Sequence, residues 1–406
     1  MKKRKWLSVL LAAVMVLAMV PMTVFAAGAT GDWGSDYDTA AEFTISTEAE
    51  LRAFAALVNE GKNFAGKTVK LAENITMSSE TWIPIGSTLD EEGDGIVGTN
   101  KFAGIFDGQG NTISNLTCTN SITDDTMTLY DATGLFGIVS GTVQNLNVTD
   151  ANITAAWTGG VIAGLLDGGT IKNCTASGTM HGFEYDGDLL ADQLGGIVGE
   201  ATGETIISGC ESAVSVSGMG NIGGILGYVE GAASATIENC DNTGNIEGTA
   251  GAIGGIVGNL ANGELKSCVN SGNITGSNNI GGIAGTIIEV TIDGCTNSGA
   301  VSAPQNSEDA MLIGGIVGNT TNQTLAIKNC VNKGSVNGGK NTGGIAGLNQ
   351  GVAISACTNT GDVTGTENVG GISGSMRMAK NAQTQKPGSV TNCTSNGAIN
   401  GTTNVG

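Results

Sequence analysis

The stretch IGGIVGNLANGELKSCVNSGNITGSNN occupies residues 253–279, and residues 280–285 begin the same phrase again as IGGIAG. Each phrase has a Gly-Gly-apolar-x-Gly head, a variable bridge, an apolar residue two or three positions before a cysteine, an Asn-x-Gly turn and an apolar residue before a closing glycine. No catalytic motif in the sequence is as clear as this repeat. The sequence therefore says more about architecture than about activity.

The head recurs along most of the chain. From Gly195 onward its starts are separated by 28, 31, 27, 33, 29 and 27 residues, and a looser copy, GGVIAG, occupies residues 159–164. The regular heads are Gly195–Gly199, Gly223–Gly227, Gly254–Gly258, Gly281–Gly285, Gly314–Gly318, Gly343–Gly347 and Gly370–Gly374. A period of this length is typical of a solenoid, in which each repeat is one supersecondary unit.

The repeat has the pattern of strands rather than helices. Glycine interrupts it every six to ten residues, whereas a helical repeat needs a longer run with a period of 3.6 residues. The apolar runs are short and rich in Ile and Val, and one repeat holds three of them, around residues 253–257, 265–268 and 273–275. We therefore predict an all-β chain that forms a parallel β-helix with three short strands per coil, the coils lying about 4.8 Å apart.

Stacked coils would place equivalent residues above one another. The eight cysteines from Cys174 to Cys393 should form one ladder inside the column. A second ladder, at a corner, should consist of Asn242, Asn270, Asn297, Asn332 and Asn359. We expect these asparagines, and the glycines two residues after them, to suit a bend that needs left-handed backbone. Side chains that point the same way rarely reach disulfide geometry, so the nine cysteines are predicted to be buried free thiols rather than disulfides.

Residues 1–26 have the pattern of a secretory signal peptide. Four basic residues, 2–5, precede an apolar run, and Ala26 ends a segment suited to cleavage. The signal holds four of the 17 basic residues and none of the 37 acidic ones, so its removal leaves a net charge of −24. This charge disfavours nucleic acid as a partner, and we expect a secreted or cell-surface protein with no membrane insertion after signal removal.

The first part of the mature chain differs from the repeats. Residues 27–42 are predicted to be a flexible lead, and residues 43–101 an N-terminal cap with one helix. Thr47 and Glu50 form a capping box, and apolar residues then recur at helical spacing up to a stop at Gly61. The β-helix is predicted over residues 102–406. It breaks off within a phrase, so we expect a longer parent chain.

The phrases Gly-Leu-Phe-Gly, Gly-Ile-Val-Gly and Gly-Ile-Ala-Gly resemble the GLUG motif, a repeat of bacterial surface proteins. LRAFAALVNEGKNFAGKTVKL (51–71), WIPIG (82–86) and FAGIFDGQGNTISNL (102–116) are similar to the segment that precedes such repeats. The resemblance covers residues 43–406 and implies an extracellular right-handed β-helix. GLUG repeats also occur as non-catalytic parts of surface peptidases that cleave immunoglobulin A. The zinc signature His-Glu-x-x-His of those peptidases is absent, since His181 is the only histidine.

Three insertions precede a glycine head, at residues 121–132, 180–194 and 302–312, so all should leave the column at one corner. The aromatic and imidazole side chains at this corner are Tyr130, Trp157, His181, Phe183 and Tyr185. They suit stacking on a sugar ring or anchoring a host surface protein. The alternative is that they fold back and seal the insertions against the column.

Two acidic clusters are candidates for Ca²⁺, which takes several oxygen ligands. They comprise Asp90, Glu91, Glu92 and Asp94, and Asp186, Asp188 and Asp192. Neither has a known calcium-binding spacing, and solvated acidic loops are the favoured interpretation, so we predict no metal and no cofactor.

An enzyme is not favoured by the residues present. A glycoside hydrolase needs two facing carboxylates, and the coils supply few at matching positions. Only three arginines are present, and one histidine cannot readily complete a nucleophilic triad. We predict a non-catalytic surface protein, adhesin-like or a rigid display stalk. The alternatives are the non-catalytic N-terminal region of a larger secreted peptidase and, less favoured, a polysaccharide-degrading β-helix.

Overall fold

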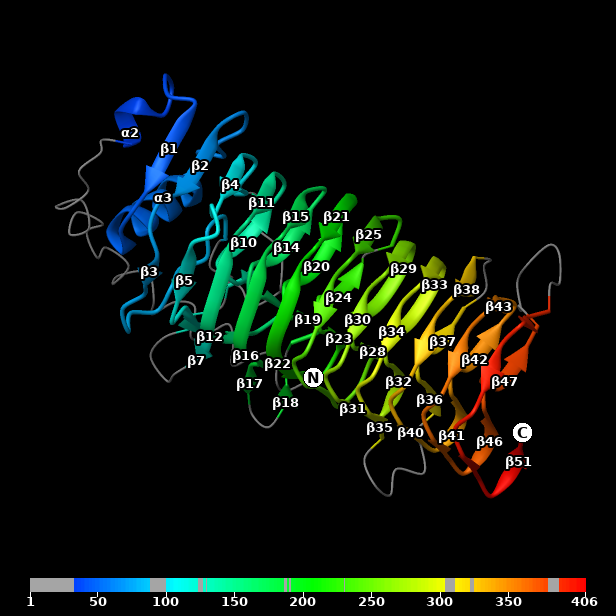
Figure 1. Ribbon diagram of the computed structural model, residues 1–406. Helices are drawn as coiled ribbons and strands as arrows, with labels where there is room; N and C mark the ends of the chain where they lie inside the picture. The colour runs from blue at the N-terminus through cyan, green and yellow to red at the C-terminus, as the bar shows by residue number, and fades with distance from the viewer. Residues whose placement is uncertain are drawn as a thin grey trace, which may run out of the picture.

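The computed structural model describes residues 33–87, 100–122, 127–128, 130–185, 188–189, 191–229, 231–303, 311–321, 325–378 and 387–406. The predicted signal peptide, the acidic residues 90–94 and Asp186 lie outside this part of the chain. Within it, the strands stack side by side along one axis from the N-terminal to the C-terminal end (Figure 1).

One coil shows how the repeat folds. Strand β28 (Ile253–Gly254) is followed by the ten-residue β29 (Val257–Lys266) and then by β30 (Val269–Asn270) and β31 (Ile274–Gly276). Each strand pairs in parallel and in register with its counterpart one coil later. The predicted parallel β-helix with three faces per coil is confirmed. The predicted run 253–257 is in fact divided between two faces, because the chain turns a corner at Gly255 and Ile256.

The three parallel sheets run the length of the column. The sheet that contains β28, here the head sheet, consists of β9 (Ala132–Thr133), β13 (Thr158–Gly160), β19 (Gln193–Gly195), β23 (Asn221–Gly223), β28, β32 (Asn278–Gly281), β36 (Met311–Gly314), β41 (Lys340–Gly343), β46 (Glu367–Gly370) and β51 (Thr403–Val405). The sheet that contains β29, here the long sheet, consists of β1 (Glu42–Ile45), β2 (Thr68–Leu71), β4 (Ile105–Asp107), β10 (Phe136–Val139), β11 (Thr142–Gln144), β14 (Ala163–Asp167), β15 (Thr170–Lys172), β20 (Val198–Thr202), β21 (Glu204–Ser208), β24 (Leu226–Val229), β25 (Ser234–Glu238), β29, β33 (Ala284–Asp293), β37 (Val317–Thr320), β38 (Ala326–Lys328), β42 (Ala346–Gln350), β43 (Ala353–Ser355), β47 (Ser373–Arg377) and β48 (Ser389–Thr391).

The third sheet contains β30 and β31 and is named the ladder sheet. It consists of β3 (Ile75–Thr76), β5 (Thr112–Ser114), β6 (Thr117–Thr119), β12 (Asn147–Ala155), β16 (Thr175–Gly182), β22 (Glu211–Gly218), β26 (Asp241–Asn242), β27 (Ile246–Gly248), β30, β31, β34 (Thr296–Asn297), β35 (Val301–Ser302), β39 (Val331–Asn332), β40 (Val336–Asn337), β44 (Thr358–Asn359), β45 (Val363–Thr364), β49 (Thr394–Ser395) and β50 (Ile399–Asn400). Two antiparallel hairpins leave the column, β7 (Ser121–Ile122) with β8 (Met127–Thr128) and β17 (Glu184–Tyr185) with β18 (Asp188–Leu189).

The predicted asparagine ladder is present on the ladder sheet. Each buried amide donates from Nδ2 to Oδ1 of the next, over 2.8 Å from Asn242 to Asn270, 2.8 Å from Asn270 to Asn297, 2.9 Å from Asn297 to Asn332 and 2.7 Å from Asn332 to Asn359. Each Nδ2 also donates to the carbonyl of the glycine two residues on, so both of its hydrogens are used. Such a satisfied column of amides fixes the register of one coil on the next.

The expectation of left-handed backbone at these asparagines was wrong. None of the five has left-handed backbone, which lies instead one residue before the cysteine, as at Asn239 and Ser267, both with φ of 53°. The glycine two residues after the asparagine is also not left-handed. A Cβ atom at Gly272 would come within 1.9 Å of the Gly244 carbonyl oxygen, so this glycine is required for close stacking rather than for an unusual dihedral angle.

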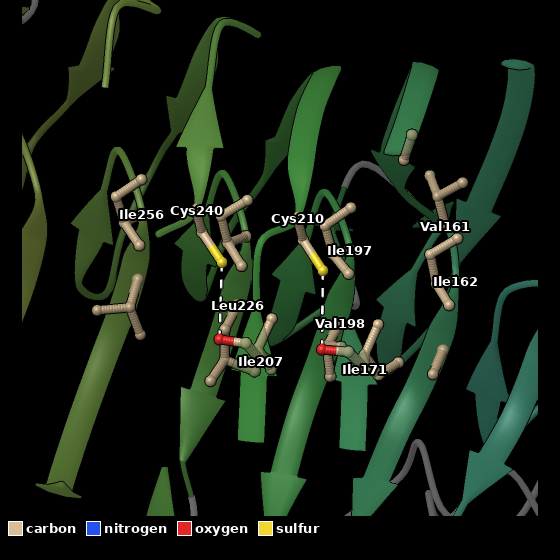
Figure 2. Packing of buried hydrophobic residues seen from close by; sticks show 14 of the residues in the cluster. Val161, Ile162, Ile171, Ile197, Val198, Ile207, Cys210, Leu226, Cys240 and Ile256 are labelled. Atoms are coloured by element: carbon tan, nitrogen blue, oxygen red, sulfur yellow. Dashed lines mark hydrogen bonds between the residues drawn. The ribbon is translucent and has the colours of Figure 1, made fainter. Parts of the chain in front are cut away.

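The core between the sheets is a continuous cluster of Ile, Val, Leu and cysteine side chains (Figure 2). All nine cysteines are free, as predicted, and all but Cys393 are buried. The Cys210 thiol donates to the carbonyl oxygen of Ile171 over 3.7 Å, and the Cys240 thiol donates to that of Ile207 over 3.6 Å. Figure 2 shows these two sulfurs side by side on successive coils. Each fully buried aliphatic side chain adds about 1.5–3 kcal/mol to this core.

The N-terminal end holds the helix that the capping box predicted. Helix α3 (Glu48–Asn59) begins after Thr47, whose side chain accepts from the Glu50 N–H while the Glu50 side chain accepts from the Thr47 N–H. Its buried residue Phe54 packs on Phe102 and Phe106, with ring centroids 5.6 and 6.1 Å apart. The helix therefore joins the first coils to one core, and its role as a cap stays a prediction.

Two boundaries at this end differ from the prediction. The lead predicted to be flexible contains helix α2 (Trp33–Asp36), and Trp33 is buried against Phe43 with ring centroids 5.1 Å apart. The β-helix also begins before residue 102, because β1 pairs with β2 and β2 pairs with β4 in the long sheet. The first strand is separated from the others by α3, which hid its relation to the repeats.

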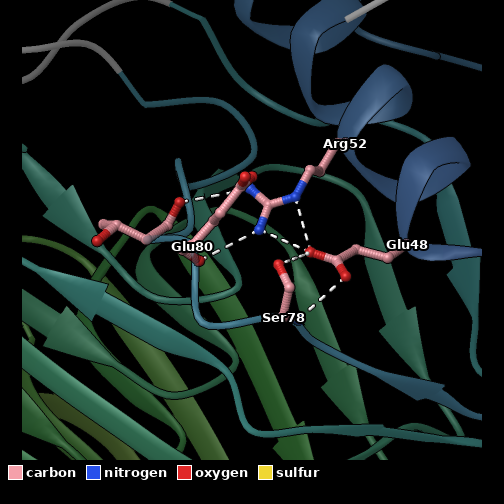
Figure 3. A network of polar contacts seen from close by, with 5 residues as sticks. Glu48, Arg52, Ser78 and Glu80 are labelled. Atoms are coloured by element: carbon pink, nitrogen blue, oxygen red, sulfur yellow. Dashed lines mark hydrogen bonds and ion pairs between the residues drawn. The ribbon is translucent and has the colours of Figure 1, made fainter.

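Polar contacts tie α3 to the segment after β3 (Figure 3). Arg52 forms an ion pair with Glu48 at 2.7 Å and donates to the Glu80 carbonyl oxygen over 3.2 Å. Ser78 donates to Glu48 through both its N–H and its hydroxyl. Burial raises the pKa of Glu48, but the bonds from Ser78 and Arg52 outweigh it and hold the pKa below its ordinary value.

Candidate functional site

The first two insertions leave the column at one corner, between the ladder sheet and the head sheet, and the third falls at the same junction in the chain. The hairpins β7–β8 and β17–β18 both follow a ladder-sheet strand and precede a head-sheet strand, and the third insertion falls between β35 and β36. Figure 1 shows β7, β17 and β18 on the same lower side of the column. Residues 304–310 of the third insertion lie outside the described chain.

The five predicted site residues do not share one environment. Tyr130 is 5% exposed and belongs to the core, and burial, followed by the neighbouring Cys118, raises its pKa to about 12. This side chain is therefore sealed against the column, as the alternative interpretation expected, and cannot stack on an external ligand. Trp157 and Phe183 are half-buried, and His181 is exposed. The backbone of Tyr185 lies in β17, and its side chain lies outside the described atoms.

The backbone brings Trp157, His181 and Phe183 to neighbouring rungs. The Trp157 carbonyl oxygen accepts from the Asp192 N–H over 3.1 Å, and the Phe183 N–H donates to the Ala155 carbonyl oxygen over 2.7 Å. His181 pairs in register with Thr154 in β12, and its Nδ1 atom lies 2.7 Å from the Ser217 hydroxyl oxygen. The corner thus combines one imidazole with two half-buried aromatic rings.

Carboxylate and amide side chains lie close to the backbone next to Trp157. The Thr158 hydroxyl lies 3.2 Å from Gln193 Oε1 and 3.3 Å from Glu200 Oε2. Burial raises the pKa of Asp192 above its ordinary value. An apolar ring next to carboxylate and amide oxygens is suited to a ligand that offers hydroxyl or N–H donors.

Two hollows on the column were not predicted from the sequence. One, of about 270 Å³, lies on the ladder sheet and is lined by Glu211 and Asp241, which pair in register. Burial, followed by the charge of Glu211, raises the pKa of Asp241. Each carboxylate directly follows a cysteine, and aligning the repeats on their cysteines would have shown the pair. The prediction that neighbouring coils supply few carboxylates at matching positions overlooked this pair.

The other hollow, of about 410 Å³, lies on the long sheet and includes Tyr228 and Glu289 among its lining residues. No recurrent motif marks this hollow. The position directly after the glycine head holds Tyr228 in this coil, but Asn259 and Asn319 in later coils. It is therefore visible only in the folded column.

The described residues do not support a metal centre. Within the described ranges, no group of three or more His, Cys, Asp or Glu side chains is placed to hold a metal ion. Among the residues with known placement, none forms a helix long and apolar enough to cross a membrane.

Comparisons with known proteins agree with the fold. The family model of the GLUG motif matches residues 219–247. Halomucin from Haloquadratum walsbyi (strain DSM 16790 / HBSQ001) is 36% identical over 123 residues, which cover 30% of this chain. The chain spans about 1% of the length of this curated relative.

A solved structure shares the architecture. It is the crystal structure of a candidate immunoglobulin A1 protease from Bacteroides ovatus, which matches with a TM-score of 0.52 and 21% identity over 73% of this chain and 82% of that chain. At this identity the likeness shows the fold alone. The resemblance to the GLUG motif is confirmed at residues 219–247, and the chain has the fold of a parallel β-helix.

Proposed function

We propose that this chain is a non-catalytic extracellular β-helix that displays a binding surface, in the manner of an adhesin or a rigid stalk. The observation that carries the proposal is the unbroken stack of in-register strands from β1 to β48 in the long sheet. Parallel pairing on three faces, with an amide ladder at one corner, makes a column that resists bending. A stiff column can hold a ligand-binding edge away from a surface.

The corner with Trp157 and Phe183 supplies the binding surface in this proposal. Two half-buried rings fit a glycan or a host surface protein, and the residue after Trp157, Thr158, holds carboxylate and amide oxygens through its hydroxyl. The names of the relatives, a halomucin and an immunoglobulin A1 protease, support an extracellular setting. The net charge of −20 for the whole chain disfavours nucleic acid as a partner.

The corner is tested with the full chain on arrays of glycans and host extracellular proteins. Trp157→Ala and Phe183→Ala should each weaken the retained interaction about tenfold, as for an aromatic anchor at an interface. Tyr130→Phe is the control, because Tyr130 is buried and its ring should not reach a ligand. Wild-type binding by both corner variants would reject this corner as the contact surface.

A non-catalytic region of a larger secreted peptidase is a second candidate, supported by the name of the solved structural neighbour. The two candidates are separated by purifying the natural protein from its source. Immunoglobulin A cleavage by that protein, together with a mass above that of this chain, would support the peptidase. A natural protein that binds but does not cleave supports display.

The pair of Glu211 and Asp241 favours a third candidate, cleavage of a polysaccharide. Facing carboxylates, one with a raised pKa, are the elements of a glycoside hydrolase. The chain is incubated with a panel of polysaccharides, and reducing ends are measured for the wild type and for Asp241→Asn. Release by the wild type that the substitution abolishes would overturn the non-catalytic proposal.

A further inference from the structure

The hollow on the long sheet is created by a change between two coils. In one coil, β24 ends at Val229 and β25 begins at Ser234, whereas β29 and β33 in the next two coils run unbroken for ten residues. The step from a broken strand to continuous strands leaves a recess of about 410 Å³. That volume lies in the range of small-molecule sites, about 300–1,000 Å³.

The lining of the recess combines an aromatic ring with amides and one carboxylate. Tyr228 lies on one side, and its register partner Asn259 lies on the next rung. Asn262 and Glu289, which also pair in register, lie further along the strands, beside the exposed side chain of Ile288. The recess thus offers one ring face and several polar atoms that point to different places on a ligand.

Asn259 lines the recess through only one of its two polar atoms. Its Oδ1 atom is buried and accepts no hydrogen bond from any residue that the structure describes. A ligand in the recess can therefore use the amide of Asn259 only through Nδ2, which donates hydrogen bonds. The same column carries a second such atom, Oδ1 of Asn319, two coils further on and outside the recess.

The charge of the recess selects among ligands. None of the described residues that line it is basic, and Glu289 carries the formal charge. An acidic sugar, a phosphate or a nucleotide would bring a second negative charge to this carboxylate, which disfavours it. A neutral sugar instead offers a ring face for Tyr228 and hydroxyl groups that can accept from Asn259 and donate to Glu289.

We propose that this recess binds one ring of a neutral sugar, stacked on Tyr228, with hydroxyl groups that accept from the Asn259 amide and donate to Glu289. The inference rests on the proposed function for its setting, a displayed binding surface. It places a contact on the long sheet, apart from the corner with Trp157. The experiment must therefore report on the two places separately.

The probes are glucose, galactose, mannose and N-acetylglucosamine as neutral glycosides, with glucuronic and sialic acid glycosides for comparison. Affinity is measured by calorimetry on the full chain and on Tyr228→Ala, Glu289→Gln and Asn259→Ala. We expect binding of at least one neutral glycoside and none of the acidic ones. Tyr228→Ala should weaken it at least tenfold, by loss of the stacking face.

Asn319→Ala is the matched control, because it removes the same kind of unpaired buried amide from the same column outside the recess. It should leave sugar affinity unchanged, whereas Asn259→Ala should reduce it. Glu289→Gln keeps the proposal testable if Tyr228→Ala fails to fold, because Glu289 is exposed. The affinity of Glu289→Gln for the sugar should fall severalfold.

Three outcomes overturn the proposal: no neutral glycoside binds, an acidic one binds more tightly, or Tyr228→Ala and Glu289→Gln bind like the wild type. If Trp157→Ala abolishes glycan binding while the recess variants bind normally, the recess is rejected and the proposed function survives. If the full chain retains no glycan and no host protein, both fail.

Discussion

The amide of Asn270 fills the space that a side chain on Gly255 would need. A Cβ atom at Gly255 would lie 2.4 Å from Asn270 Cγ and 2.2 Å from the Gly282 carbonyl oxygen. The second glycine of the head and the ladder asparagine of the same repeat are therefore one fitted unit. The same approach recurs in the pairs Gly224–Asn242, Gly282–Asn297, Gly315–Asn332 and Gly344–Asn359.

Replacing Gly255 by alanine should therefore cost about 3 kcal/mol or more, since the Cβ atom would overlap backbone that cannot move without disturbing the next coil. Gly110→Ala is the control. Gly110 has a φ of 78° but nothing within 4 Å of its Cβ position, so it should lose only about 1 kcal/mol. Urea unfolding measures both, and an equal loss would contradict the packing argument.

The position of an asparagine in its ladder should determine what its removal costs. Asn297 accepts from Asn270 and donates to Asn332, whereas Asn242, at one end, donates to Asn270. Asn297→Ala leaves buried polar groups without partners on both sides, and we expect a loss of about 2–4 kcal/mol. Asn242→Ala should cost less. Equal unfolding midpoints for the two variants would argue against a connected ladder.

The thiols should be inert until the column opens. Eight of the nine are buried, and burial raises the pKa of Cys118 to about 12. Because the thiolate is the reactive form, a thiol reagent at pH 8 should titrate at most Cys393 in the native chain and all nine in denaturant. Cys393→Ser should abolish the native-state reaction. Rapid labelling of several thiols without denaturant would place cysteines on the surface.

The repeat made the fold and its ladders predictable because glycine, asparagine and cysteine recur at fixed offsets. The physical roles were harder to assign. Left-handed backbone was expected at the ladder asparagines but lies before the cysteine, as at Asn239, because periodicity reports position and not dihedral angle. The start of the β-helix at β1 was hidden because α3 interrupts the pattern of strands.

The candidate site was predictable only in part. Insertion length correctly placed two hairpins at one corner. Exposure could not be derived from residue type, so Tyr130 was expected at the surface as one of two alternatives and is buried. The recess at Tyr228 depends on how a broken strand abuts a continuous one, which no single repeat encodes.

Acid should weaken the fold partly through Asp107. Burial raises its pKa, but the bonds from the Gln109 N–H, Asn145 and Gln144 outweigh this and leave the pKa below its ordinary value. A carboxyl with a lower pKa in the folded than in the unfolded chain stabilises the fold above about pH 4, and loses that contribution as pH falls through the folded-state pKa.

Asp107→Asn should therefore flatten the pH dependence of the urea midpoint below about pH 4, while making the protein less stable at pH 7. The exposed residue Asp38 provides the control substitution, Asp38→Asn, which should leave the profile of the wild type unchanged. A wild-type profile in Asp107→Asn would show that these hydrogen bonds contribute nothing to acid sensitivity.

The contacts of Arg52 test whether α3 secures the N-terminal end of the column. The guanidinium bonds Glu48 and the Glu80 carbonyl oxygen and lies 5.6 Å from the centroid of the buried ring of Trp82. Arg52→Ala should lower stability by about 1–3 kcal/mol and speed hydrogen exchange in α3 and at residues 78–82. Arg52→Lys should recover only part of the loss, because an ammonium cannot reproduce the planar fork. Faster hydrogen exchange that extends into β4 and β11 would support a capping role for α3. Normal protection in those strands would show that the column is stable without the contacts of this helix.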